Sequence, residues 1–236
     1  MNRSLGVTEW ILAVLPSWSV SFFELLSLFG DLFVIVAVVG LVSLIDVIQS
    51  VQRQGDRATA PLCSDRTSML IATVFGGLAL IVALEAVFTA PRPPADWHAI
   101  VPSEYGFPSG HTMAALILWG ALAQWMTVGR RQTRYVAVAG IVALVGVSRL
   151  ALGVHYLVDV VAAVGFGLVY LLVVRRVMSG SPSRGFVIAV AISVVAVGVS
   201  AGSSRGLLAL GGTVGAAVGW WVIEQPAVKQ LVFRFV

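Results

Sequence analysis

Long apolar runs separated by short polar or charged segments dominate the chain. Seven of these runs approach the roughly 20 residues that a helix needs to cross the hydrocarbon core of a membrane. They lie at 30–48, 67–89, 111–128, 134–151, 156–174, 186–202 and 206–223. The runs lack the alternation of apolar and polar residues that membrane barrel strands show. The pattern therefore predicts an all-α fold, a polytopic transmembrane helix bundle.

The first apolar stretch, residues 7–28, fits this pattern less well. Pro16 and Glu24 interrupt it, and it carries the aromatic residues Trp10, Trp18, Phe22 and Phe23. Aromatic residues concentrate where a membrane meets water. We interpret the stretch as an interfacial helix that lies in the membrane plane. A cleaved signal peptide is the alternative, although the composition suits it less well.

The composition supports a membrane protein and argues against several other classes. Of the 236 residues, 58% are hydrophobic and only 11% are charged, against about 25% charged in a soluble domain. So few charges could not cover the surface of a soluble enzyme. They also argue against a disordered scaffold or a nucleic-acid partner, despite a net charge of +4. The single cysteine, Cys63, excludes an intrachain disulfide and a cysteine-cluster metal site.

The basic residues predict how the bundle is oriented. With seven spans, eleven of the fifteen Lys and Arg residues lie on one side, in loops 49–66, 129–134 and 175–185 and in the C-terminal tail. Basic residues accumulate on the cytoplasmic side of membrane proteins. We therefore expect a multi-pass cell-membrane protein with a cytoplasmic C-terminus, whose loops 90–110 and 149–155 face outward.

The first of these outer loops ends in Pro108-Ser109-Gly110-His111, which opens a predicted helix. A helix start offers unpaired backbone N–H groups and a positive dipole end, and both favour an anion. Ser109 adds a hydroxyl group, and Gly110 allows the backbone to come close to a ligand. The structural alternative is a serine cap followed by a histidine with no chemical role.

The second outer loop holds Ser148-Arg149, followed by His155 and Asp159. His155 and Asp159 are four residues apart, so they share one face of a helix. Asp159 lies in an apolar run, where an ionisable residue is costly and usually has a partner. A carboxylate bonded to one imidazole nitrogen leaves the other available as a nucleophile or base. A buried His–Asp pair that only joins two helix ends is the alternative.

Together the outer loops supply two arginines, two histidines, a serine, a helix start and an aspartate. This set suits phosphoryl transfer through a covalent phosphohistidine. Arginines bind phosphoryl oxygens, and the helix start neutralises developing charge. One histidine attacks phosphorus while the other protonates the leaving oxygen.

These motifs resemble the signatures of the type 2 phosphatidic acid phosphatase (PAP2) superfamily of membrane lipid phosphatases, written K-x6-R-P, P-S-G-H and S-R-x5-H-x3-D. The second and third signatures are complete in this chain. The first is partial, because Arg92-Pro93 is present but Glu85 occupies the lysine position. The resemblance covers about residues 30–175 and implies a PAP2-like catalytic core there. The predicted interfacial segment, 1–29, and the additional transmembrane helices with a cytoplasmic tail, 176–236, lie outside it.

The resemblance also implies a role for each site residue. His155 would be the nucleophile, Asp159 its orienting partner and His111 the general acid. The residues that would bind the phosphoryl group are Arg92, Ser109, Gly110 (through its amide) and Arg149. The family requires no metal or other cofactor, and the sequence has no acidic cluster suited to Mg²⁺.

Glu85 departs from the family pattern. Seven residues of helix span about 10 Å, so a lysine there could extend toward a phosphate, whereas glutamate is shorter and carries the opposite charge. Glu85 could pair with Arg92 or Arg149, be protonated, mark an impaired site, or simply face solvent. We prefer the first interpretation, because an unpaired charge in a membrane is costly. On this hypothesis Glu85→Lys keeps or raises phosphatase activity.

The sequence thus predicts a membrane lipid phosphate or diphosphate phosphatase that acts through a phosphohistidine at the outer membrane face. The expected partners are a lipid phosphate and the membrane. The alternatives are a lipid phosphotransferase of the same family, or a non-enzymatic lipid-binding or scrambling protein with a degenerate site. A transporter or channel fits less well, because the ionisable residues gather at one membrane face. The sequence does not specify which lipid is the substrate, the oligomeric state, or the role of the last two helices.

Overall fold

The computed structural model describes residues 3–54, 61–102 and 104–234, and within these ranges every regular element is helical. The elements are α1 (Val7–Val14), α2 (Ser19–Ser27), η1 (Leu28–Gly30), α3 (Leu32–Gln54), α4 (Asp65–Phe88), η2 (Ala95–Trp97), α5 (Gly110–Trp125), α6 (Arg131–Ala151), α7 (Leu157–Met178), α8 (Pro182–Val199), α9 (Ser204–Ile223) and α10 (Pro226–Arg234). Six of them, α3, α4 and α6 to α9, are long and apolar enough to cross a membrane. The predicted all-α membrane bundle is confirmed. Arg57, in the basic loop 49–66, lies outside the described residues.

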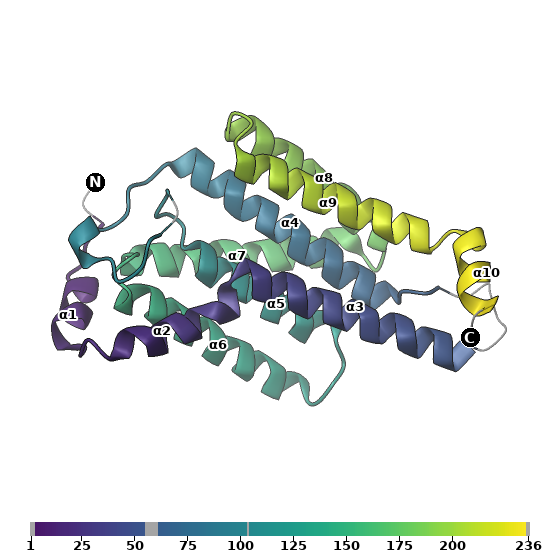
Figure 1. The fold of residues 1–236 in the computed structure, drawn as a ribbon, viewed down its shortest axis with the longest axis horizontal. Helices are drawn as coiled ribbons and strands as arrows, with labels where there is room; N and C mark the ends of the chain where they lie inside the picture. The colour runs from purple at the N-terminus through teal and green to yellow at the C-terminus, as the bar shows by residue number, and fades with distance from the viewer. Residues whose placement is uncertain (1–2, 55–60, 103, 235–236) are drawn as a thin grey trace.

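The predicted span 111–128 forms a shorter helix than the apolar run indicates. Helix α5 has 16 residues, or about 24 Å of rise, whereas the hydrocarbon core is about 30 Å thick. It lies in the middle of the bundle, packed against α4, α6 and α7 (Figure 1). Because protein surrounds α5, its length does not need to match the bilayer. The candidate span 111–128 is thus a shorter helix than predicted, and it is not among the six that are long enough by length and composition to cross a membrane.

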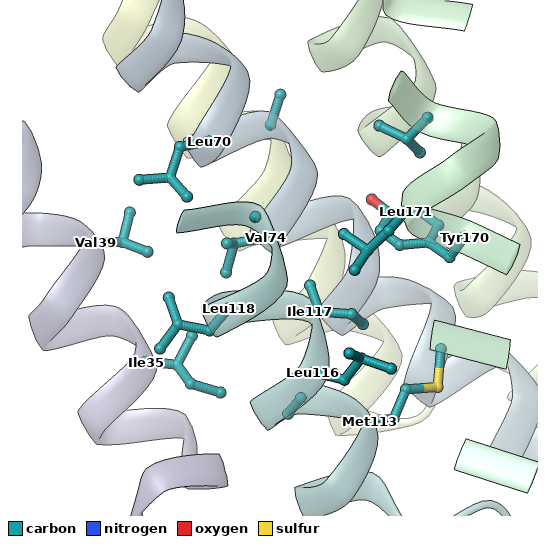
Figure 2. Packing of buried hydrophobic residues seen from close by; sticks show 14 of the residues in the cluster. Ile35, Val39, Leu70, Val74, Met113, Leu116, Ile117, Leu118, Tyr170 and Leu171 are labelled. Carbon is teal, nitrogen blue, oxygen red and sulfur yellow. The ribbon is translucent and has the colours of Figure 1, made fainter. Parts of the chain in front are cut away.

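Apolar side chains from four helices fix α5 in this central position. Figure 2 shows Leu116, Ile117 and Leu118 of α5 among residues of α3, α4 and α7. Ile117 and Leu118 are fully buried. At Gly77 of α4, an added Cβ would lie 2.7 Å from Ile117, so glycine permits the close approach of these two helices. The core thereby fixes where the first turn of α5 lies.

The N-terminal stretch 7–28 forms two short helices rather than one. Helices α1 and α2 are separated by the segment around Pro16, where a continuous helix would lose a hydrogen bond and meet a steric clash. Both helices pack on α6. The hydroxyl of Thr8 donates a hydrogen bond to the His155 carbonyl oxygen over 3.1 Å. The N-terminal segment therefore covers the end of the bundle that carries the signature residues.

Helices α8 and α9 form a hairpin that lies along α4 (Figure 1). The turn between them brings the first residues of α9 to the same end of the bundle as the end of α4, where Glu85 lies. The chain outside the PAP2-like core thus reaches the predicted site from both termini, through α1 and through α9.

Candidate active site

The signature residues come together where α4 and α6 end and where α5 and α7 begin. The Ser109 amide donates to the Asp159 carbonyl oxygen over 3.1 Å, which joins the starts of α5 and α7. The Arg92 guanidinium donates to the Val154 carbonyl oxygen over 2.8 Å, which ties the loop after α4 to the loop before α7. Residues far apart in the sequence therefore meet at one end of the bundle.

His155 is buried, and its surroundings determine which ring nitrogen carries the proton. Its Nδ1 atom lies 2.8 Å from the Gly106 carbonyl oxygen, which can only accept a hydrogen bond. Nδ1 therefore holds the hydrogen, and the lone pair is on Nε2. An Arg92 Nη1 donor lies 3.0 Å from Nε2. This tautomer leaves the lone pair of Nε2 on the side where the Arg92 guanidinium lies.

The environment of His155 also keeps the ring neutral. Burial lowers the pKa of His155 well below its ordinary value, and the positive charges of Arg92 and Arg149 lower this pKa further. A protonated imidazole has no lone pair with which to attack phosphorus. Burial and the two arginines thus favour the neutral form of His155, which is the form that its predicted role as nucleophile requires.

Asp159 lies close to His155 but has other partners. Its Oδ2 atom is 3.5 Å from His155 Nδ1 and accepts a 2.8 Å hydrogen bond from the Tyr156 amide at the start of α7. Its Oδ1 atom lies 2.6 Å from Nη1 of Arg3. Asp159 therefore caps α7 and binds the N-terminal segment while it faces the imidazole, whose Nδ1 proton the Gly106 carbonyl accepts. Its role as the orienting partner of His155 stays a prediction.

Arg149 is the strongest indication of an anion site. Its side chain is buried, and among the described residues Nε and Nη1 have no hydrogen-bond partner. Buried guanidinium donors are normally satisfied, because leaving them unpaired costs free energy. A phosphoryl group bound between Arg149 and Arg92 would satisfy these donors.

The start of α5 faces the same region. Ser109 is fully buried, and its hydroxyl lies 2.9 Å from that of Thr112. The Ser109 side chain does not cap the first amides of α5, so the helix start offers donors to an anion. Ser109, Gly110 and Arg149 thus have the surroundings that a phosphate-binding role requires, and that role stays a prediction.

His111 has a more open environment than His155. About a third of its side chain, 35%, is exposed, and its Nε2 atom lies 4.0 Å from Oδ2 of Asp31, just before α3. An accessible imidazole beside a carboxylate suits a group that exchanges protons with a leaving oxygen and with water. The geometry is compatible with the predicted general acid.

The structure gives Glu85 a partner that the sequence did not indicate. Its Oε2 atom lies 2.6 Å from Nη2 of Arg205, in the first turn of α9. A Cβ added at Gly110 would lie 2.9 Å from Glu85 Oε1, so the carboxylate reaches the start of α5. Glu85 is thus ion-paired at the edge of the site with Arg205, an arginine that lies outside the signatures.

Sequence reasoning missed four residues of this site: Gly106, Arg3, Asp31 and Arg205. Position 106 requires glycine, because an added Cβ would lie 2.9 Å from the Pro91 carbonyl oxygen. Asp31 could have been noticed as an acid at the edge of an apolar run. Nothing in the local sequence indicates that Arg3 and Arg205 lie near His155 and Glu85, since the tertiary packing brings them there.

In the described part of the chain, no group of three or more His, Cys, Asp or Glu side chains is arranged to hold a metal ion. Residues 67–182 match the PAP2 superfamily. Over 79 residues the chain is 33% identical to phosphatidylglycerophosphatase B of Bacillus subtilis (strain 168), a match that covers 31% of this chain and 39% of that protein. The chain thus matches about two fifths of the length of this curated relative. No solved structure matches the chain.

Proposed function

Because residues 67–182 belong to the PAP2 superfamily, we propose that this membrane protein is a lipid phosphatase that acts through a phosphohistidine. The observation that carries the proposal is the neutral His155, with Nε2 beside Arg92 and with the unpaired donors of Arg149 buried at the same end of the bundle. A nucleophile next to empty anion-binding donors suits attack on a phosphate. The relative named phosphatidylglycerophosphatase supports a lipid phosphate as the substrate.

In the proposed reaction, Nε2 of His155 forms a bond to phosphorus while the bond from phosphorus to the leaving oxygen breaks. His111 donates a proton to that oxygen. Water then attacks the phosphohistidine, His111 accepts a proton from the water, and inorganic phosphate leaves with His155 restored. Arg92, Arg149 and the α5 amides would neutralise the charge that develops on the phosphoryl oxygens. No step requires a metal ion.

We also propose that the site faces outward and that the C-terminus is cytoplasmic. The arginines at the start of α6 and α8 and at the end of α7 lie at the opposite end of the bundle from His155. They are Arg131 and Arg134, Arg184, and Arg175 and Arg176. Accumulation of basic residues on the cytoplasmic side supports this orientation.

The test is phosphate release by purified protein from phosphatidylglycerophosphate, phosphatidic acid and an isoprenyl diphosphate, with a chelator present. We expect release by the wild type and a loss on the order of 10⁴-fold or more in His155→Ala, because no other group replaces the nucleophile. Equal release by the two proteins would contradict the proposal. Release that is dependent on an added divalent cation would contradict its metal-independent form, and transfer of phosphate to an added alcohol would indicate the phosphotransferase.

A further inference from the structure

Arg205 reaches the site from helix α9, which lies outside the matched region 67–182. Its Nη2 atom lies 2.6 Å from Glu85 Oε2, and while Glu85 is buried, 43% of the Arg205 side chain is exposed. A guanidinium has five N–H donors in a planar fork, so an ion pair with one carboxylate leaves further donors for a ligand. Glu85 thus holds a partly exposed cation next to the start of α5.

A cavity of about 320 Å³ connects Arg205 with the catalytic residues. Gly110 and His111 line it, together with Asp31 and Arg205, and the rest of its lining is mainly apolar. The apolar side chains include Leu32, Phe75, Leu78, Ile81, Val82 and Leu208. Residues 31, 111 and 205 all lie at or next to helix starts at one end of the bundle, whereas Phe75 lies nearly three turns before Glu85 in α4. The cavity therefore has a polar end and an apolar body.

The chemistry places the leaving group in this cavity. In an in-line displacement the attacking atom and the leaving oxygen lie on opposite sides of phosphorus. His155 does not line the cavity, whereas His111 does. If Nε2 of His155 attacks and His111 protonates the leaving oxygen, the leaving part of the lipid extends past His111 toward Arg205 and the apolar walls.

We propose that Arg205 binds a second anionic group, carried by the leaving part of the lipid, and so selects the substrate. This inference rests on the phosphatase function proposed above. Phosphatidylglycerophosphate has a phosphodiester in its leaving group, and an isoprenyl diphosphate has a second phosphate there. Phosphatidic acid releases neutral diacylglycerol. The protein therefore prefers lipids whose leaving group carries a second phosphate over phosphatidic acid. Arg205 supplies the positive charge that position 85 lacks.

A purely structural role for Arg205 makes a different prediction. If Arg205 only neutralises Glu85, removing both charges together in Glu85→Gln/Arg205→Gln leaves substrate preference unchanged. If Arg205 binds the substrate, the double variant loses the preference as the single variant does, because no cation faces the leaving group. Arg184→Gln is a matched control, since Arg184 is an exposed arginine at the start of α8, at the other end of the bundle.

The experiment measures kcat/KM for phosphatidylglycerophosphate and phosphatidic acid with identical acyl chains, in the wild type and these variants. For Arg205→Gln we expect kcat/KM for phosphatidylglycerophosphate to fall roughly ten- to hundredfold, as for loss of one charge-assisted hydrogen bond. We expect kcat/KM for phosphatidic acid to change by less than about threefold in the same variant. The double variant should behave like Arg205→Gln, and Arg205→Lys should retain part of the preference. Arg184→Gln should match the wild type.

Two results would overturn this inference while the phosphatase function stands: an unchanged ratio of the two kcat/KM values in Arg205→Gln, or a wild-type ratio in the double variant. If the wild type releases phosphate from neither lipid and from no isoprenyl diphosphate, the proposed function fails and this inference fails with it. Because each result is a ratio of two substrates on one protein preparation, a variant that folds in low yield still gives an answer.

Discussion

The two histidines of the site have opposite surroundings. The His155 side chain is 1% exposed and held on both nitrogens, by the Gly106 carbonyl oxygen and by Arg92. The His111 side chain is 35% exposed, and the carboxylate near it, that of Asp31, lies 4.0 Å away. One imidazole is fixed in one tautomer and shielded from water, and the other opens onto the cavity that leads to Arg205.

The difference matches the demands of the two proposed roles. A nucleophile gains from a fixed orientation and a neutral form, because attack requires alignment of one lone pair with phosphorus. A group that donates a proton in one step and accepts one in the next needs access to the leaving group and to water. The difference in burial thus suits two chemically identical residues to the two different roles proposed for them.

After the loss expected for His155→Ala, the largest expected effect tests His111. With a lipid phosphate, His111→Ala should lower kcat/KM by about 10²- to 10⁴-fold, because the alkoxide leaves poorly without a proton. With p-nitrophenyl phosphate the first step should be almost unaffected, since p-nitrophenolate leaves without one. Stopped-flow measurement of p-nitrophenolate should then show a burst followed by slow turnover, because the second step still lacks its base.

Equal losses for the two substrates, with no burst, would mean that His111 does not act as the acid. His98→Ala is the matched control, since His98 lies between α4 and α5, near the same end of the bundle, but is bound to the Pro93 carbonyl oxygen. It should leave both activities unchanged.

The chemistry of the site could be predicted from the sequence where it is local. The four-residue spacing of His155 and Asp159 and the Pro108–His111 helix start indicated which residues gather. The partner of the His155 Nδ1 proton could not be predicted, because Gly106 offers only a backbone carbonyl and is 49 residues away. Such a contact depends on how two loops pack.

The next prediction concerns how activity depends on pH through His155, the proposed nucleophile. Because burial, Arg92 and Arg149 lower the pKa of His155 well below its ordinary value, the neutral nucleophile should persist below pH of about 6.5. The acid limb of the kcat/KM profile that reports His155 should therefore lie below that pH. The measurement is kcat/KM against pH for one lipid phosphate, in the wild type and in a variant that changes only the surroundings of His155.

Arg3→Ala is that variant, and its effect should be smaller than those of the predictions above. Arg3 binds Asp159 over 2.6 Å, and its positive charge contributes to the lowering of the His155 pKa. Removing it should raise this pKa, so the acid limb should move toward neutral pH. Ionisation of the substrate cancels in the comparison. A limb that stays in place, or that moves to lower pH, would show that Arg3 does not act on His155.

In the fold too, features set by the local sequence could be predicted, whereas those set by tertiary packing could not. Apolar runs predicted the positions of α3, α4 and α6 to α9, because a lipid environment requires a minimum length of apolar helix. The same length criterion overestimated α5, which is surrounded by protein and has only 16 residues. For residues 7–28 the interfacial interpretation did not indicate that Pro16 divides the stretch into two short helices. The contributions of Arg3 and Arg205 depend on how the terminal segments pack, so no spacing rule reveals them.

The central claim is that His155 forms a covalent bond to phosphorus, and trapping this intermediate tests it most directly. His111→Ala protein would be incubated with ³²P-labelled p-nitrophenyl phosphate and quenched in alkali, where a phosphohistidine survives, and the labelled peptide sequenced by mass spectrometry. The account predicts an acid-labile phosphoryl group on His155 that is absent from a His111→Ala/His155→Ala protein. An active wild type together with no label, or a label on any other residue, would contradict it.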